Sequence, residues 1–186
     1  ECGVCDGSGA DYSCWNLELA CDSSECSDQP ANYPDWDTNF DGVLDNYNDY
    51  ENNGSITTRV YEDGVDVSSS GDLVAVFVAD EQRGVGVSSD VPVFLGGGYA
   101  FLIMVYSIET AGETLTFQYY RASTDEVLEI SSTIEFTSNM VEGDVTEPYV
   151  LTYNPGDGGG DDCASGVYDC AGVCDGDAVE DCAGDC

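Results

Sequence analysis

The residues best suited to chemistry in this sequence are the oxygen-bearing side chains of one short stretch. They recur mostly at alternate positions, and they are Asp35, Asp37, Asn39, Asp41, Asp45 and Asp49. Side chains at this spacing can turn toward a single ion, and Gly42 permits the sharp bend that such a turn requires. Carboxylate and amide oxygens are the ligands that Ca²⁺ prefers in proteins. The stretch therefore predicts a calcium loop.

The register of this stretch is that of an EF-hand loop through its ninth position. The ligands would be Asp37, Asn39, Asp41, the carbonyl of Val43, and Asp45. Here the sequence resembles the calcium loops of dockerins and thrombospondin type 3 repeats. It departs from them at the twelfth position, where Asn48 replaces a bidentate Glu and Asp49 or Glu51 would substitute. No helix pair is evident, so we expect a lone loop; the alternative is a solvated acidic turn.

Sulfur is confined to the two ends of the chain. The cysteines are Cys2, Cys5, Cys14, Cys21, Cys26, Cys163, Cys170, Cys174, Cys182 and Cys186. Dense cysteine in Gly/Asp-rich segments predicts disulfides and an oxidising compartment, with the pairing left open. Each cluster holds five, so full oxidation requires a disulfide between the clusters, within the chain or between molecules. The alternative, a Cys₄ zinc or iron–sulfur site, fits Cys2-x₂-Cys5 but not the other, irregular spacings.

The two ends also resemble each other. Val4–Cys14 is similar to Val173–Cys182, and Asp169–Cys174 is similar to Asp181–Cys186. These segments resemble acidic Cys/Asp repeats of thrombospondin type 3 character, and their weaker candidate calcium ligands are Asp6, Asp11, Asp175, Asp177 and Asp181. The ends look like two halves of one repeating module, which predicts contact from the tail of one copy to the head of the next.

Charge excludes several classes of function. The chain carries 38 acidic residues against three arginines, a formal net charge of −35, without Lys or His. Such a surface repels nucleic acid and anionic membranes and favours metal cations. Without His or Lys there is neither a Ser-His-Asp or Cys-His pair nor a Schiff-base lysine, so we expect no enzyme. The longest apolar run, Tyr99–Tyr106, is too short to span a bilayer.

Four segments follow from the texture of the chain: a Cys-rich segment (1–34), the Asp/Asn-rich loop (35–52), a β-domain (53–153) and a Gly-rich linker with the second Cys-rich repeat (154–186). Strands are expected at Ile56–Tyr61, Leu73–Ala79, Gly84–Val87, Val91–Leu95, Tyr99–Ile108, Thr114–Tyr120, Val127–Ile130, Thr133–Thr137 and Tyr149–Tyr153. Short strands at this spacing predict an all-β fold, an antiparallel β-sandwich of immunoglobulin-like or jelly-roll type. Because the chain begins at Glu1 without Met or a signal peptide, we expect a processed product or a segment of a longer protein.

Two surface features bear on a rival function. Trp15, Trp36, Tyr47 and Tyr50 are candidate platforms for sugar rings, although such side chains also serve as miniature cores in disulfide-rich segments. Asn53-Gly-Ser55 is an N-glycosylation sequon ahead of the first expected strand. Glycans are therefore possible partners, bound or attached.

The whole chain is similar to one unit of the repetitive secreted surface proteins of environmental bacteria. The likeness rests on Asp-Cys-Ala-Gly-Val-Cys at 169–174 and on runs such as Asp41-Gly-Val-Leu-Asp45 and Gly71-Asp-Leu-Val-Ala-Val-Phe-Val78. It implies a β-sandwich module without known catalysis, in a cell-surface or fibre architecture. We therefore expect an extracellular or cell-surface structural protein, stabilised by Ca²⁺ and disulfides, that assembles with itself head to tail into a filament, stalk or surface fibre. The alternative is a secreted carbohydrate-binding or adhesion module.

Overall fold

The structure is a computed structural model that describes residues 12–154, and it confirms the expected all-β fold. The main sheet comprises β3 (Asn52–Glu62), β4 (Val65–Asp66), β5 (Leu73–Val78), β6 (Glu81–Asp90), β7 (Tyr99–Ser107), β8 (Ala111–Arg121), β9 (Glu126–Thr137), β10 (Val141–Glu142) and β11 (Tyr149–Tyr153). A separate hairpin pairs β1 (Tyr12–Ser13) with β2 (Leu19–Ala20). Three single-turn 3₁₀ helices complete the set: η1 (Ser23–Glu25), η2 (Tyr47–Asp49) and η3 (Val93–Leu95). Within 12–154 no helix is long and apolar enough to cross a membrane.

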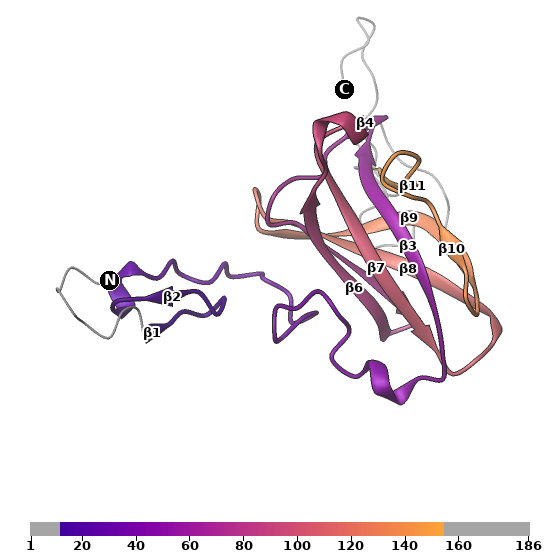
Figure 1. Ribbon diagram of the computed structural model, residues 1–186, viewed down its shortest axis with the longest axis horizontal. Coiled ribbons are helices and arrows are strands. Elements are labelled where there is room, and N and C mark those ends of the chain that lie inside the picture. Colours follow the sequence, from indigo (N-terminus) through magenta and orange to yellow (C-terminus); the bar gives the residue numbers. More distant parts are fainter. Residues whose placement is uncertain (1–11, 155–186) are drawn as a thin grey trace, which may run out of the picture.

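One curled sheet supplies both layers of the fold. Its strands follow the order β10-β3-β7-β6-β5-β8-β9, with β4 and β11 also paired to β3. The pairs are antiparallel except for β10 and β11, which run parallel to β3. The sheet curls until β11 lies along β9, where the Ser132 hydroxyl accepts the Thr152 N–H at 2.9 Å. Figure 1 shows β3, β7 and β6 crossing in front of β8 and β9.

The core fills the space inside the curl. Leu115, Phe117 and Tyr119 on β8 are buried and alternate with the less buried Thr114, Thr116 and Gln118. The core cluster contains only residues between Ile56 and Leu151, so it needs nothing from residues 12–51. Burying a large apolar side chain stabilises the fold by about 1.5–3 kcal/mol. The sheet therefore has its own source of stability.

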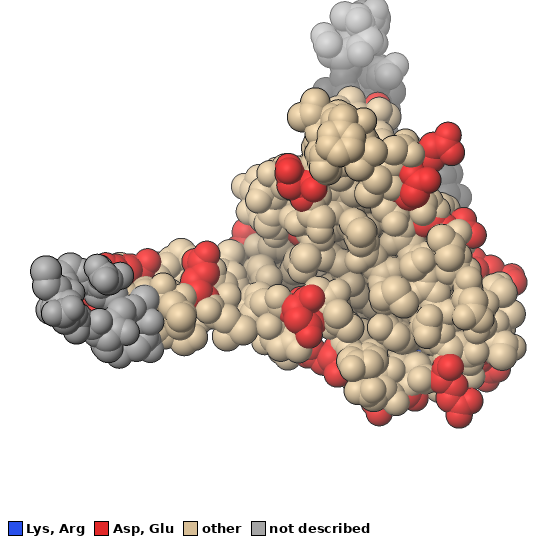
Figure 2. Space-filling model, in the orientation of Figure 1, with Lys and Arg blue, Asp and Glu red and all other residues tan. Residues whose placement is uncertain are grey.

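All three arginines of the chain are used inside the sheet. Arg59 lies 2.9 Å from Asp66, Arg83 lies 3.0 Å from Glu113, and Arg121 lies 3.0 Å from Glu62. Their side chains are only 11%, 4% and 18% exposed, respectively. The face drawn in Figure 2 accordingly carries acidic side chains and no basic ones.

Two strand predictions were wrong in detail. Val91–Leu95 is not a strand but the start of a loop containing η3, because Pro92 lacks an N–H and Gly96, Gly97 and Gly98 adopt positive φ. The two strands expected between 127 and 137 form one continuous strand, β9. A turn at Asp63–Gly64 connects β3 to β4, with φ of 51° and 78°.

The sheet topology separates the entry and the exit of the chain. The chain enters β3 at Asn52, shortly after the Asp-rich residues 35–49. The last strand, β11, runs parallel to β3. Tyr153 therefore pairs with Glu62 at the end of the sheet opposite Asn52. At about 3.3 Å per residue, the two points lie roughly 30 Å apart along β3.

Candidate functional site

The acidic loop (residues 35–49) is wound around one buried carboxylate. Asp37 is 3% exposed, and its carboxylate accepts the N–H of Asp41 at 3.2 Å and the N–H of Gly42 at 2.7 Å. The next two alternate positions repeat the pattern, since Asn39 accepts the N–H of Asp41 and Asp41 accepts the N–H of Val43. Gly42, at the sixth position of the predicted loop, has φ +75°. The first seven positions thus make the tight turn that the sequence predicted.

The sheet holds this loop from outside. Leu44 is 3% exposed, and any side chain at Gly42 would touch the methyl groups of Val87 on β6. The side-chain amide of Gln82 donates to the Trp36 carbonyl at 2.7 Å. The indole of Trp36 lies edge-on to Phe77, with 6.2 Å between ring centroids. The loop is therefore seated on β5 and β6.

The remaining predicted ligands are less gathered. Asp35, Asp45 and Asp49 are exposed; Asp45 accepts the Thr38 hydroxyl at 2.5 Å, and Asp49 lies in η2. Among residues 12–154 no three acidic or Cys side chains come together as a metal-ligand group. The backbone of the loop thus has the predicted bend, whereas its carboxylates do not converge on one point.

The chemistry of Asp37 nevertheless fits a cation. A buried carboxylate is costly unless a positive charge or several donors compensate it. Asp37 has two backbone donors, but it takes part in none of the ion pairs of the described residues, and all three arginines pair elsewhere. Hard divalent ions are bound by oxygen donors of the kind that Asp37, Asn39 and Asp41 supply. These three residues would hold such an ion.

Residues 12–31, here called the arm, project from the sheet in Figure 1. A disulfide joins Cys14 to Cys26, with 5.5 Å between their Cα atoms, and Cys21 is disulfide-bonded as well. The sequence predicted disulfides in this segment but left their pairing open. The described part of the Cys-rich segment contains the short hairpin of β1 and β2. A segment this short cannot bury enough apolar surface to form a hydrophobic core, so the disulfide stabilises it instead.

Aromatic rings join the arm to the sheet. Trp15 packs edge-on to Tyr33 and Phe40, with centroids 4.9 and 5.9 Å away. Tyr33 in turn lies 5.2 Å from Tyr120 on β8. Burial raises the pKa of Tyr33, and the nearby Asp37 carboxylate raises that pKa further. The Tyr33 hydroxyl therefore stays neutral beside the acidic loop.

The outer part of the arm leaves apolar side chains in solvent. Tyr12, Leu17 and Leu19 are 46%, 54% and 65% exposed. Only Cys14 and Ala20 of the hairpin region are buried. Nothing else among the described residues covers this apolar surface.

Two of the four aromatic side chains proposed as sugar platforms pack against a third tyrosine ring. Tyr47 and Tyr50 both lean on Tyr106 of β7, at 5.8 and 6.3 Å. The Tyr50 hydroxyl donates to Glu81, and its ring lies 4.9 Å from the Arg83 guanidinium. Burial first, and then the hydrogen bond to Glu81, raise the pKa of Tyr50. With Trp15 and Trp36, all four rings contact aromatic neighbours, as the miniature-core alternative expects.

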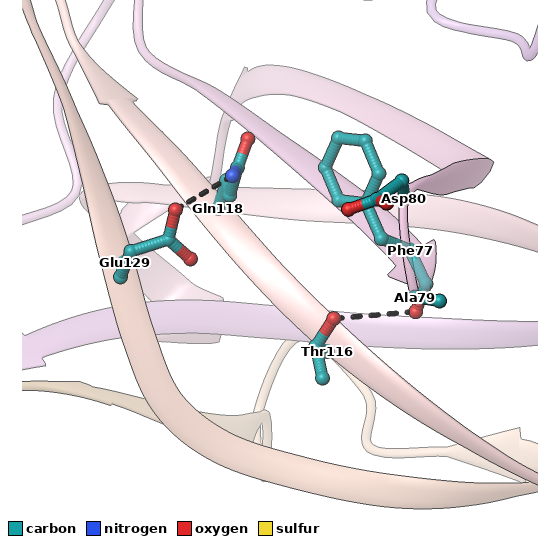
Figure 3. Close-up of a pocket in the computed structure, with 6 residues that line it drawn as sticks. All are labelled: Phe77, Ala79, Asp80, Thr116, Gln118 and Glu129. Atoms are coloured by element: carbon teal, nitrogen blue, oxygen red, sulfur yellow. Dashed lines mark hydrogen bonds between the residues drawn. The ribbon is translucent and has the colours of Figure 1, made fainter. Parts of the chain in front are cut away.

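A groove that sequence reasoning missed lies next to Phe77, the ring that Trp36 contacts. Its volume is ≈ 350 Å³, and it is lined by Phe77, Ala79, Asp80, Thr116, Gln118 and Glu129. Figure 3 shows Gln118 and Glu129 joined on one side, at 2.6 Å, with Phe77 and Asp80 on the other. These residues come from β5, the turn after it, β8 and β9, so only the strand order brings them together. Nothing in the spacing of the sequence signals the groove.

The sequon asparagine lies on β3. Asn53 is exposed, and its carbonyl accepts the Asn139 N–H at 2.7 Å. Gly54 beside it is buried under Met140, where a Cβ would come within 2.4 Å of a side-chain carbon. An attached glycan would leave from the exposed side of this strand.

The other predicted site residues lie outside residues 12–154. They are Asp6, Asp11, Asp175, Asp177, Asp181, Cys2, Cys5, Cys163, Cys170, Cys174, Cys182 and Cys186. For them the sequence-based predictions stand as they were made.

Comparison of the chain with known protein families, curated proteins and solved structures finds no match.

Proposed function

We propose that this chain is an extracellular or cell-surface structural subunit that assembles head to tail into a filament, stalk or fibre, braced by disulfides and Ca²⁺. One observation carries the proposal: the arm projects from the sheet and keeps Tyr12, Leu17 and Leu19 exposed. Apolar surface displayed on a projecting, cross-linked element is typical of a contact with another molecule. A second copy of the same chain would cover it.

The path of the chain supports an extended assembly. The chain leaves the sheet at Tyr153, at the opposite end of β3 from its entry. The arm projects from a different side of the sheet from the one where β11 ends (Figure 1). A contact between two unlike patches repeats from copy to copy and generates an open chain or a ring.

Calcium would reduce the repulsion between such acidic copies and stabilise the acidic loop. Extracellular sites bind Ca²⁺ with Kd of about 10⁻⁴ to 10⁻³ M. At ten times that Kd, one site stabilises the fold by roughly 1.4 kcal/mol. A disulfide typically contributes about 2–4 kcal/mol. Together these would stiffen a segment that buries little apolar surface of its own.

Sedimentation velocity and negative-stain imaging of the whole chain test the proposal. With about 5 mM Ca²⁺, several times the expected Kd, we expect linear particles that shorten when the ion is chelated. Gels run without reductant should show ladders if disulfides join copies. A strictly monomeric species at all concentrations, with and without Ca²⁺, contradicts the proposal.

The groove next to Phe77 favours a second candidate, carbohydrate binding. It offers the Phe77 ring together with the oxygen and nitrogen atoms of Asp80, Gln118 and Glu129. Sugars are recognised by aromatic faces combined with a few placed polar groups. A glycan-array signal that Glu129→Gln removes while the fold is intact would favour this function, and an array without signals would count against it.

A further inference from the structure

The loop from Val91 to Gly98, here called the tip, carries the most exposed apolar side chains among the described residues. Val93 and Phe94 are 89% and 85% exposed. The tip connects β6 to β7 and lies beside β4, at the end of the sheet where β11 leaves. It contains no charged residue, although the chain as a whole has 38 acids.

The tip is held in one conformation by hydrogen bonds. The Val91 N–H donates to the Gly98 carbonyl at 2.9 Å, and the Leu95 N–H donates to the Pro92 carbonyl at 2.8 Å. The buried guanidinium of Arg59, on β3, donates to the Gly97 carbonyl at 2.7 Å and also pairs with Asp66. A phenyl ring displayed on a backbone fixed in this way loses little conformational freedom when it binds.

We propose that the tip of one copy packs on the arm of the next copy and forms the apolar centre of the head-to-tail joint. This inference rests on the proposed function and adds the residues that meet. The tip would present Val93 and Phe94 to the exposed Tyr12, Leu17 and Leu19 of the arm.

Charge selects a second copy as the occupant. Two surfaces of chains with a net charge of −35 can approach only where carboxylates are few. The tip has none, and Tyr12–Cys21 of the arm has only Glu18. Both surfaces are apolar, both are exposed in a single copy, and they lie on different sides of the sheet (Figure 1). The tip also lies at the end where the chain passes on toward its C-terminal Cys-rich segment, the predicted partner of the next copy's arm.

A single aromatic side chain at the centre of such a joint should dominate the affinity. Truncating a buried aromatic anchor weakens association by about 30-fold or more. We therefore expect Phe94→Ser to weaken self-association of the full chain by at least about 30-fold in sedimentation velocity. The matched control is Val141→Ser, which removes another apolar side chain that is 76% exposed, on β10, and should change association little. Near-ultraviolet circular dichroism of each variant verifies the fold.

The outcomes separate this inference from the proposed function. A wild-type chain that never assembles overturns both. Assembly that Phe94→Ser leaves unchanged overturns the role of the tip and leaves head-to-tail assembly standing. Association lost equally in Phe94→Ser and Val141→Ser also overturns that role, because the effect is then not specific to the tip.

A photo-crosslinker at position 94 identifies what covers the tip, with mixed ¹⁴N and ¹⁵N chains to distinguish copies. Crosslinks from position 94 to residues 12–20 of another copy support the inference. Crosslinks within one copy to residues 155–186 overturn it, because the chain's own tail is then the occupant. Flotation with phosphatidylcholine vesicles that Phe94→Ser abolishes would also overturn it, because the tip then inserts into lipid.

Discussion

The curled sheet and the segment that precedes it (residues 12–51) differ in how the negative charge of their carboxylates is compensated. In the sheet, each of the three arginines is paired with a carboxylate, and Arg83 and Arg121 also lie against tyrosine rings. Residues 12–51 contain ten acidic residues and no basic one. The sheet has a continuous apolar core, whereas the segment relies on a disulfide, a few aromatic contacts and the hydrogen bonds around Asp37.

This difference determines which region responds to ions, reductants and other copies of the chain. The sheet compensates its buried charges internally, with arginines and, at the buried Asp72, with the Tyr119 hydroxyl and two backbone N–H groups. Ions and reductants should therefore change its stability little. The segment leaves the Asp37 charge without a cation of the chain's own, so its order should depend on what the solvent and other copies supply. Stability would reside in one region and environmental sensitivity in the other.

The largest effect is expected from opening a cavity in the sheet. Phe117→Ala should lower the free energy of unfolding by about 3–5 kcal/mol, because the ring is 1% exposed in the core. Denaturant titration with Ca²⁺ and with chelator measures it, and the loss should be the same in both. Phe94→Ala, at a ring that is 85% exposed, is the matched control and should change the stability of the monomer by less than about 0.5 kcal/mol. A loss for Phe117→Ala that varies with Ca²⁺ would show that the two regions are coupled.

Breaking an internal ion pair should have a smaller effect. Arg83→Met leaves Glu113, whose side chain is 16% exposed, without its cation, and should cost about 2–3 kcal/mol. Adding Glu113→Gln should recover part of that loss, because the unpaired charge is then removed as well. If the double variant is as unstable as the sum of its two single variants, the pair is not what stabilises this end of β8.

Removing the buried charge of the acidic loop should affect stability only when Ca²⁺ is present. Asp37→Asn should remove about 1–1.5 kcal/mol of calcium-dependent stabilisation at ten times the Kd. In chelator the variant should match or exceed the wild type, because an uncompensated buried charge is gone. Asp28→Asn, at an exposed position of the arm, is the control. A calcium-dependent gain that survives Asp37→Asn would place the ion elsewhere.

The smallest effect is expected at alkaline pH, and the two tyrosines with the most strongly raised pKa values both lie in the sheet. Burial and a hydrogen bond to Asp72 raise the pKa of Tyr119 far above 10, the ordinary value in an unfolded chain. Burial and a hydrogen bond to Asp125 do the same for the pKa of Tyr120. The folded state then keeps protons that the unfolded state loses, so stability falls as pH rises through 10. Each tyrosine should contribute under about 0.5 kcal/mol of loss at pH 10 and more above it. Unfolding free energies measured from pH 8 to 11 should decline less steeply in Tyr119→Phe, and a flat wild-type profile would contradict the assignment.

Much of the sheet was predictable because burial leaves a period of two in the sequence. Leu115, Phe117 and Tyr119 show it, and all three are buried on β8. The bend of the acidic loop was predictable for a similar reason, since its hydrogen bonds join residues two to five positions apart. Local patterns predict local structure.

What depended on distant contacts was not predictable. The strand expected at Val91–Leu95 is the tip, because apolar residues alone do not distinguish a buried strand from an exposed loop ahead of three glycines. The parallel pairing of β11 with β3 and the groove next to Phe77 follow from strand order, which alternation does not encode. The partners of the three arginines, such as Glu113 for Arg83, are likewise set by the tertiary fold.

Two complementary truncations test head-to-tail assembly most directly. One chain would retain residues 1–154 and carry Phe94→Ser, so that it keeps the arm but lacks both the C-terminal segment and the aromatic ring of the tip. The other would retain residues 27–186, and so keep the tip and the C-terminal segment but lack the disulfide hairpin. Both keep the whole core, which lies between Ile56 and Leu151. In sedimentation equilibrium with Ca²⁺, we predict that each is monomeric alone and that the mixture forms a one-to-one complex that grows no further. Homodimers of the 1–154 chain, or no complex in the mixture, would contradict head-to-tail assembly.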